Sequence, residues 1–341
     1  MMKILTFGEM MLRLKTPNNE RIMQASQFEA TYGGAEANVA VSLASLGDGA
    51  TFLTKFPDNL LGDRGEATLA QYHVDTSEIR RGGTRMGIYF FEKGASVRPT
   101  NVVYDRAGSA FATATASEFD WENILTDVDY FYFSGITPAL SAELELAVTQ
   151  ACQYCQIHQI PVICDLNYRA KLWSPEKAQA TMNKLMPYVN VCLAHDEDFV
   201  SSLGIEAFDG NMRHGIEQKD QFKSAMQQVV AKYPQCHTIA SVLRDIKSVE
   251  DSRWTATMLH DGKFYDAPTY QMHVMEGVAA GDAFGAGIVH GLVNGFLPQE
   301  QINYAMAASV LKLTITGDLN LVRDQEIRNL MNDHGGVGMQ R

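Results

Sequence analysis

Short apolar stretches alternate with amphipathic stretches along most of the chain. The apolar stretches have the length of buried strands, and we expect strands at 3–10, 50–56, 129–135, 161–167, 190–195 and 237–243. The amphipathic stretches favour helices, which we expect at 36–47, 64–74, 141–159, 175–189, 221–233, 283–295 and 300–314. Alternation of strands and helices is typical of a parallel sheet covered by helices on both faces. The sequence therefore predicts an α/β protein with three layers.

One region departs from this alternation. Residues 86–106 have the pattern of two strands joined by a glycine-containing turn, and residues 10–16 alternate in the same way. We expect these segments to form a small antiparallel sheet that projects from the main sheet as a lid. No repeat, low-complexity stretch or proline-rich linker divides the chain, so the sequence predicts one domain over 1–335.

Composition narrows the class of protein. The 341 residues carry a formal net charge of −12, so we expect no nucleic-acid partner, because phosphates need a basic face. No window approaches the roughly 20 apolar residues of a membrane span, and the N-terminal stretch lacks the pattern of a secretory signal. Five cysteines, an odd number, fit a reducing compartment. We therefore expect a cytoplasmic protein without membrane association.

The stretch GVAAGDAFGAG at 277–287 joins a loop of small residues to a predicted helix. Gly277, Ala279, Ala280 and Gly281 leave their N–H groups open, and such a nest before a helix binds anions. Asp282 lies at the junction, where a carboxylate can accept the proton of an attacking hydroxyl group. The alternative is that Asp282 only caps the helix.

Two further stretches place polar residues at strand ends, where ligands bind in open α/β sheets. Asp165, Asn167 and Arg169 alternate in CDLNYR, and Arg suits a carboxylate or a phosphate. The alternative there is an internal Asp–Arg pair. Tyr104 and Arg106 follow the lid hairpin and suit a polyol with negative charge, or else they are a packing Tyr and a solvated Arg.

A glycine pair precedes the first predicted helix. Gly33 and Gly34 let the backbone approach a ligand closely, and Asn38 follows in the first turns of that helix. The alternative is an ordinary loop before a helix. No G-x-G-x-x-G, P-loop or G-x-S-x-G motif is present, which argues against dinucleotide-binding proteins, P-loop proteins and α/β-hydrolases.

Together these stretches resemble a known family. GGAEAN, DLNYR and AAGDAF occur in the order and spacing of the PfkB (ribokinase-like) carbohydrate kinases, over about 1–330. Within that family the chain is similar to the 2-keto-3-deoxygluconate kinases, through stretches such as TFGEMMLRL, SGITPALS and CDLNYRAKLW. The resemblance implies a ribokinase-like αβα fold with a β lid that also forms a dimer contact.

The resemblance also implies roles for individual residues. Asp282 matches the general base, beside an anion hole formed by the backbone of Ala279, Ala280 and Gly281. The residues that match substrate contacts are Gly34, Asn38, Tyr89, Tyr104, Arg106, Asn167, Arg169 and Asp282. Those that match positions near ATP are Asp165, His195, Arg244, Gly281 and Ala308. Mg²⁺ is implied with ATP, because the charge of the phosphoryl group must be neutralised.

Three departures from the family pattern concern the nucleotide end. The second signature usually reads D-T-T-G-A-G-D, but here it begins with Glu276 and has Ala279 in place of Gly. The N-x-x-E metal-and-phosphate motif falls near 193–199, where the sequence has His195 and no Asn, so the metal ligands are not assigned. Arg244 occupies the position of a Gly-containing loop.

Three functions remain open at this point. The first is ATP-dependent phosphorylation of 2-keto-3-deoxygluconate to 2-keto-3-deoxy-6-phosphogluconate, because a sugar acid needs the arginines that this acidic protein places in the lid and at a strand end. The second is a kinase of another sugar, such as fructose. The third is a non-catalytic sugar-binding protein of the same fold.

Overall fold

The middle layer is a nine-stranded mixed sheet. In the computed structural model, which describes residues 2–333, its strands follow the order β14-β13-β12-β11-β10-β9-β1-β4, with β15 paired to β13. The pairs from β4 to β12 are parallel, and those that join β12 to β13, and β13 to β14 and β15, are antiparallel. The strands are β1 (Lys3–Phe7), β4 (Gly49–Leu53), β9 (Tyr130–Ser134), β10 (Val162–Asp165), β11 (Val191–His195), β12 (Thr238–Ile246), β13 (Asp251–His260), β14 (Lys263–Asp266) and β15 (Tyr270–His273).

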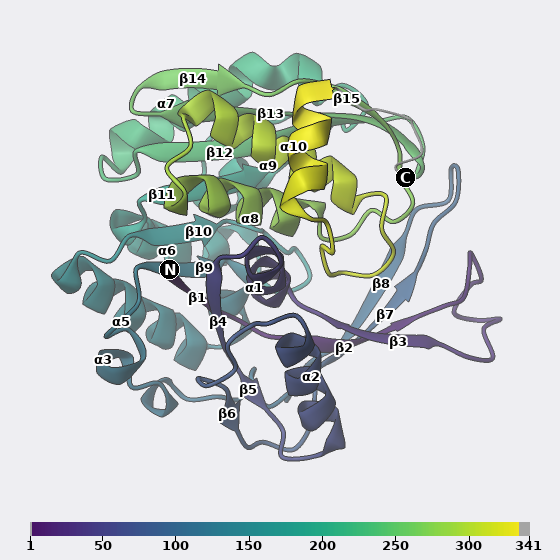
Figure 1. Ribbon diagram of the computed structural model, residues 1–341, viewed down its shortest axis with the longest axis vertical. Coiled ribbons are helices and arrows are strands. Elements are labelled where there is room, and N and C mark those ends of the chain that lie inside the picture. Colours follow the sequence, from purple (N-terminus) through teal and green to yellow (C-terminus); the bar gives the residue numbers. More distant parts are fainter. Residues whose placement is uncertain (1, 334–341) are drawn as a thin grey trace.

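Helices cover both faces of this sheet (Figure 1). Phe131 and Phe133 of β9 point into one core, which α3, α5, α6 and α7 cover, whereas Tyr132 points into the other, which α1, α2, α8 and α9 cover. This alternation along a buried strand confirms the predicted three-layer αβα fold. The helices are α1 (Ala35–Ser45), α2 (Leu60–Gln71), α3 (Trp121–Ile124), α4 (Ile136–Leu140), α5 (Ala142–His158), α6 (Pro175–Leu185), α7 (Lys219–Lys232), α8 (Ala280–Val293), α9 (Pro298–Lys312) and α10 (Asp324–Asp333).

Local side chains explain where several helices begin. The Ser141 hydroxyl accepts a hydrogen bond from the Leu144 N–H at 3.2 Å and so caps α5. Ser174 caps α6 in the same way and Pro175 occupies its first position. Helix α2 begins four residues earlier than the hydrophobic pattern predicts, because the Asn59 side chain accepts from two backbone N–H groups there.

The lid is a separate four-stranded sheet in the order β3-β2-β7-β8, and it projects from the main body (Figure 1). Strands β2 and β7 pair in parallel, so the expectation of a purely antiparallel lid is wrong. Their common direction follows from the fact that both leave the body of the protein at the same edge. The strands are β2 (Met11–Lys15), β3 (Glu29–Gly33), β7 (Ile88–Glu92) and β8 (Asn101–Asp105), and a two-stranded sheet contains β5 (Lys55–Phe56) and β6 (Arg80–Arg81).

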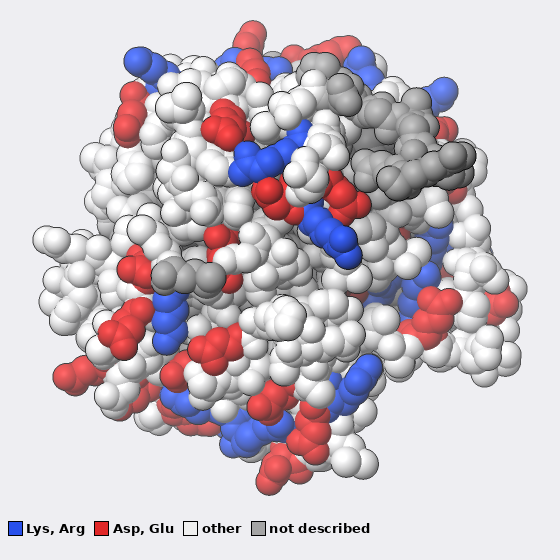
Figure 2. Space-filling model, viewed as in Figure 1, with Lys and Arg blue, Asp and Glu red and all other residues white. Residues whose placement is uncertain are grey.

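The structure bears differently on the predicted elements, the domain bounds, the membrane association and the surface charge. Strands β3, β13, β14 and β15 and helix α10 lie outside the elements predicted from the sequence. The single domain over 1–335 stays a prediction, and residues 1, 334 and 335 of it lie outside the described residues. Within 2–333, no helix is both long and apolar enough to cross a membrane. On the face seen in Figure 2, basic side chains are interspersed with acidic ones.

Candidate active site

A cleft opens between the lid and the carboxyl ends of the central strands. It encloses about 510 Å³, at the edge where ligands bind in open parallel sheets. The proposed residues that line it are Gly34, Asn38, Tyr89, Tyr104, Arg106, Asp165, Asn167, Arg169, His195, Arg244, Ala279, Ala280, Gly281 and Asp282. Ala308 does not line this cleft. It is fully buried on the face of α9 that packs against Val322 and Ile327, so the expectation that it flanks adenine is corrected.

Helix α8 directs its N-terminus at the cleft. The N-cap residue is Ala279, which has left-handed backbone angles (φ 59°, ψ 15°) and provides no side-chain cap. Asp282 lies inside the first turn of α8, so the alternative that it serves as the N-cap is wrong. The N–H groups of the first turn are therefore not occupied by a capping side chain, and with the helix dipole they can hold an anion.

Asp282 is held beside this helix terminus in a buried position. Its side chain accepts a hydrogen bond from Nδ2 of Asn38 at 2.7 Å, and Asn38 itself comes from the first turns of α1. Burial raises the pKa of Asp282 to about 7, with smaller contributions from the charges of Asp165 and Glu36. A carboxylate with a pKa near neutrality suits proton abstraction, because it is partly ionised and still basic.

His195 lies between two carboxylates at the end of β11. Its Nδ1 is 3.5 Å from an oxygen of Asp165 and 3.5 Å from an oxygen of Asp198. Burial opposes the positive charge, but the two carboxylates outweigh it and raise the pKa of His195 to about 10. Burial also raises the pKa of Asp198, yet the N–H groups of Tyr168 and His195 donate to its two oxygens, which favours its ionised form.

The other ring nitrogen of His195 faces the anion-binding turn. A Cβ atom on Gly281 would lie 3.0 Å from Nε2 of His195, so any larger residue there would require the imidazole to shift away from α8. Nε2 has no hydrogen-bond partner among the described residues. A protonated imidazole in this position directs an N–H donor at the first turn of α8, where an anion would lie.

Arg106 is already paired within the protein. Its guanidinium donates from Nε to Oε2 of Glu9 at 2.8 Å, and Nη2 donates to the same oxygen. The Ser109 hydroxyl donates to the other oxygen of Glu9. The expectation of a free Arg106 charge for a substrate carboxylate is therefore corrected, since Glu9 neutralises it. The alternative of a solvated Arg106 is wrong as well, because the side chain is buried.

Arg169 differs from Arg106 in its surroundings. It is exposed at the cleft and donates from Nη1 to the carbonyl oxygen of Tyr168 at 2.9 Å. Among the described residues it forms no ion pair, and Asp165 instead accepts from Asn167 at 3.0 Å, so the alternative of an internal Asp165–Arg169 pair is wrong. Arg169 is thus the cleft arginine whose charge is available to a ligand.

The two lid tyrosines lie opposite each other in the β7–β8 ladder. Tyr89 and Tyr104 are direct partners, with ring centroids 6.0 Å apart. Tyr89 is buried and its hydroxyl donates to Asp318, whereas Tyr104 is exposed. Both rings line the cleft, so they can cover a bound sugar from the lid side.

A buried charge cluster connects the lid to the loop before α8. Arg13 of β2 donates from Nη1 to Asp318 at 2.9 Å and from Nη2 to Glu276. Lys15 lies 3.0 Å from the second oxygen of Glu276. Burial opposes the charge of Glu276, but Arg13 and Lys15 outweigh it and lower its pKa. The cluster fixes Glu276, six residues before Asp282, to the base of the lid.

Arg244 and Trp254 form the far end of the cleft. The guanidinium of Arg244 pairs with Asp196 and lies 5.2 Å from the centroid of the Trp254 ring. A long β12–β13 hairpin carries both residues, in the place where the resemblance implies a Gly-containing loop. This end of the cleft therefore offers a flat aromatic surface and the guanidinium of Arg244, whose charge Asp196 partly neutralises.

Oxygen ligands for a divalent cation are present in the cleft. Asp165, His195 and Asp198 have donor atoms within 4.8 Å of one another, but the histidine holds a proton between the carboxylates and Mg²⁺ prefers oxygen. Oδ1 of Asp165 accepts no hydrogen bond from the described residues, although Nδ1 of His195 lies 3.5 Å from it, and Glu197 is exposed at the cleft. Asp165 and Glu197 thus fit the one or two carboxylates that magnesium–nucleotide sites use.

Comparison with known proteins gives the class of protein. The model of the pfkB family of carbohydrate kinases matches residues 1–324. The chain therefore belongs to the pfkB family of carbohydrate kinases, as its sequence motifs and its ribokinase-like fold indicate.

Particular relatives are similar over most or all of their length. The solved 2-dehydro-3-deoxygluconokinase from Thermotoga maritima is 42% identical, with a TM-score of 0.93 over 97% of this chain and 100% of that chain. The 2-dehydro-3-deoxygalactonokinase from Haloferax volcanii is 32% identical over 99% of both proteins. The 5-dehydro-2-deoxygluconokinase from Bacillus subtilis is 25% identical over 90% of this chain and 88% of that protein.

Proposed function

We propose that this protein catalyses ATP-dependent phosphorylation of 2-keto-3-deoxygluconate to 2-keto-3-deoxy-6-phosphogluconate. The observation that carries the proposal is Asp282, a buried carboxylate with a pKa of about 7 in the first turn of a helix without a side-chain cap. That arrangement supplies a base for a hydroxyl group beside a site for the anion that the hydroxyl attacks.

In the proposed reaction Asp282 accepts the proton of the terminal hydroxyl of the sugar. Asn38 is a positioning residue, since its amide donates to one carboxylate oxygen at 2.7 Å and leaves the other for the substrate. The N–H groups of Ala280 and Gly281 stabilise the charge of the transferring phosphoryl group. The imidazolium of His195 adds a donor on the same side, which offsets the loss of Asn from the usual motif.

The arginine and the tyrosines support an acidic sugar as substrate. Arg169 offers a planar fork to a carboxylate, while Tyr89 and Tyr104 cover the sugar from the lid. The names of the relatives refer to dehydro-deoxy derivatives of gluconate and galactonate, which are sugar acids. Since gluconate and galactonate derivatives differ at a single carbon, both 2-keto-3-deoxy epimers are included in the test.

ATP with Mg²⁺ is the proposed phosphoryl donor. Carboxylates outnumber basic groups among the residues that line the cleft, so a cation bound with the polyphosphate would offset their repulsion. Asp165 and Glu197 would hold the magnesium ion, which neutralises phosphate charge when it is bound. Arg244 and Trp254 lie where the nucleotide base would pack. A cytoplasmic location and a dimer formed through the lid complete the proposal.

The test is release of ADP by the purified full-length chain with ATP and Mg²⁺. Separate reactions contain 2-keto-3-deoxygluconate, 2-keto-3-deoxygalactonate, fructose and ribose. Turnover with the sugar acids and its loss in Asp282→Asn support the proposal. Turnover with fructose or ribose alone would support a kinase of a neutral sugar. Sugar binding without ADP release from any substrate would support a non-catalytic sugar-binding protein.

A further inference from the structure

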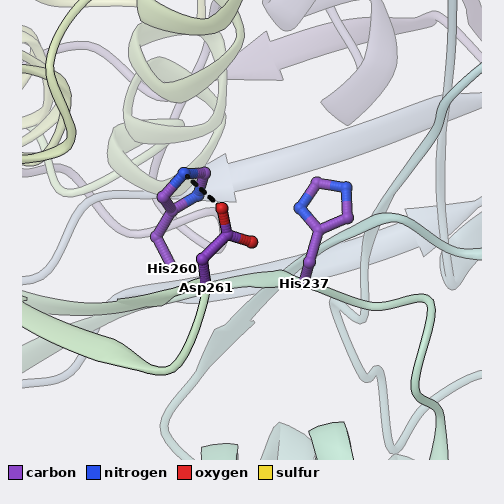
Figure 3. A group of neighbouring side chains, drawn as sticks. All are labelled: His237, His260 and Asp261. Carbon is purple, nitrogen blue, oxygen red and sulfur yellow. Dashed lines mark ion pairs between the residues drawn. The ribbon is translucent and has the colours of Figure 1, made fainter.

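Two histidines and an aspartate converge at the end of the sheet that lies away from the cleft. His237 precedes β12, His260 ends β13, and Asp261 begins the turn to β14 (Figure 3). Donor atoms of the three side chains lie within 4.8 Å of one another. The cleft residue Val242 lies four positions along β12 from Thr238, which is about 13 Å in a strand. This cluster is therefore separate from the candidate active site.

The backbone that carries these residues is held by several hydrogen bonds. The N–H of Asp261 donates to the carbonyl oxygen of His237 at 3.0 Å, which ties the turn to the start of β12. Thr238 and His260 are direct partners in the β12–β13 ladder. Asp261 and Gly262 both have positive φ angles, of 46° and 78°, as a two-residue hairpin turn requires. The three side chains thus project from a fixed frame, as ligands of a preorganised site do.

A buried hydroxyl contacts both imidazole rings. Oγ1 of Thr238 is 3.1 Å from Nδ1 of His237 and 2.8 Å from Nδ1 of His260. A hydroxyl oxygen has two lone pairs and can accept from both rings. Nε2 of His260 then faces Asp261, 3.5 Å from its carboxylate, whereas Nε2 of His237 is turned away from the other two residues, so the His237 ring would have to turn to bind an ion (Figure 3). The other ring N–H of a metal-binding histidine usually donates to a carboxylate, a backbone carbonyl or water, and the Thr238 hydroxyl would take that place for His260.

We propose that His237, His260 and Asp261 bind a divalent transition-metal ion such as Zn²⁺, with Thr238 as the group that orients His260. Two imidazoles and one carboxylate suit zinc, nickel or copper, and they do not suit magnesium or calcium. Three protein ligands leave the fourth tetrahedral position to water. Ligand atoms around zinc lie about 3.3 Å apart, so the exposed side chains of His237 and Asp261 would have to rotate to close the site around an ion.

The ion would stabilise the edge of the central sheet. Strand β14 is the last strand on that side, and the β13–β14 turn reaches β12 through the backbone bond to His237. A metal bound across His237 and Asp261 would add a second link between the same two segments. We therefore expect zinc to raise thermal stability and to leave kinase turnover unchanged.

The test is a zinc titration of the full-length chain, with any affinity tag removed, by competition against a chromophoric chelator. We expect one equivalent to disappear in His237→Ala and in His260→Ala, and the affinity of that equivalent to fall about 10- to 100-fold in Thr238→Val, which keeps the shape but loses the hydroxyl. His273→Ala is the control for an exposed surface histidine. His195→Asn removes a ligand of the other three-residue group, and that variant should keep the equivalent.

A thermal scan provides the second readout. The melting temperature of the parent and of His273→Ala should rise with Zn²⁺ and not with Mg²⁺, and that of His237→Ala should not respond to either ion. Zinc binding that is the same in His237→Ala, His260→Ala and the parent would overturn the proposal. Binding that disappears only in His195→Asn would also overturn it and would assign the ion to the cleft.

Discussion

Replacement of Asp282 by Asn should stabilise the folded protein while it removes catalysis. The carboxyl group has an ordinary pKa of 3.8, and burial raises it to about 7 in the folded state. Below about pH 4 it is protonated in both states and has no effect on stability. Between pH 4 and 7 the unfolded chain ionises first, so folding requires proton uptake and stability falls as pH rises. Above pH 7 the ionised carboxylate lowers the free energy of unfolding by its full amount.

The size of this effect follows from the shift in pKa. Three pKa units correspond to about 4 kcal/mol at full ionisation. With the two pKa values, the cost is about 1.5 kcal/mol at pH 5 and about 4 kcal/mol at pH 8, so it grows by about 2.5 kcal/mol between them. The asparagine side chain of the variant would be neutral at both pH values, and its carbonyl oxygen can still accept from Asn38. The variant should therefore gain stability over the parent, and more at pH 8 than at pH 5.

Urea unfolding of the parent and of Asp282→Asn at pH 5 and pH 8 measures this difference. The exposed carboxylate variant Asp127→Asn is the control for the loss of one negative charge. Its free energy of unfolding should follow the parent at both pH values. An Asp282→Asn protein whose stability also runs parallel to the parent would refute the buried, high-pKa carboxylate, and with it the main argument for Asp282 as the base.

Three further predictions concern the same cleft. The value of kcat/KM should fall about tenfold for each pH unit below about pH 7, because only ionised Asp282 accepts a proton; a flat profile down to pH 5 would contradict this. In Arg169→Ala, KM for the sugar acid should rise about 10- to 100-fold, which corresponds to the free energy of a charged hydrogen bond. Arg169→Lys should reverse part of this rise in KM. An unchanged KM would show that another group binds the substrate carboxylate. Ala279→Gly should raise the free energy of unfolding by about 1 kcal/mol, because Ala279 has left-handed backbone angles; a loss of stability on urea unfolding would show that the strain is absent.

Patterns along the sequence could predict the layers because each has a local cause. Buried parallel strands have continuous apolar runs, and helix starts such as Ser141 have a capping side chain within a few residues. The same patterns did not predict strands β13, β14 and β15. Its strands pair antiparallel beyond the last parallel strand, so no βαβ alternation marks them.

The candidate site was predictable where its residues follow strands. It was less predictable where its side chains pair with residues that are distant in the sequence. The rule that ligands bind at strand ends finds Asp165 and Arg169, whereas Asp282 is found by the run of small residues before α8. Glu9 lies two residues after the end of β1 and inside the strand expected at 3–10, so the rule did not indicate it. The pairing of Glu9 with Arg106 joins segments 97 residues apart. No local pattern indicates that pairing, and it reverses the expected role of the arginine.

The altered second signature has a structural consequence of its own. Glu276 replaces the usual Asp, and its longer side chain reaches Arg13 and Lys15 of β2 and the N–H of Gly317. Asp318 completes the cluster, and separation of a buried ion pair of this kind costs about 3–5 kcal/mol. The base of the lid is therefore fixed to the loop that forms the anion site. Closure over a sugar must therefore involve the lid beyond the Tyr89–Tyr104 pair, which lies level with Arg13, while β2 keeps the helix terminus and Asp282 in register with the substrate.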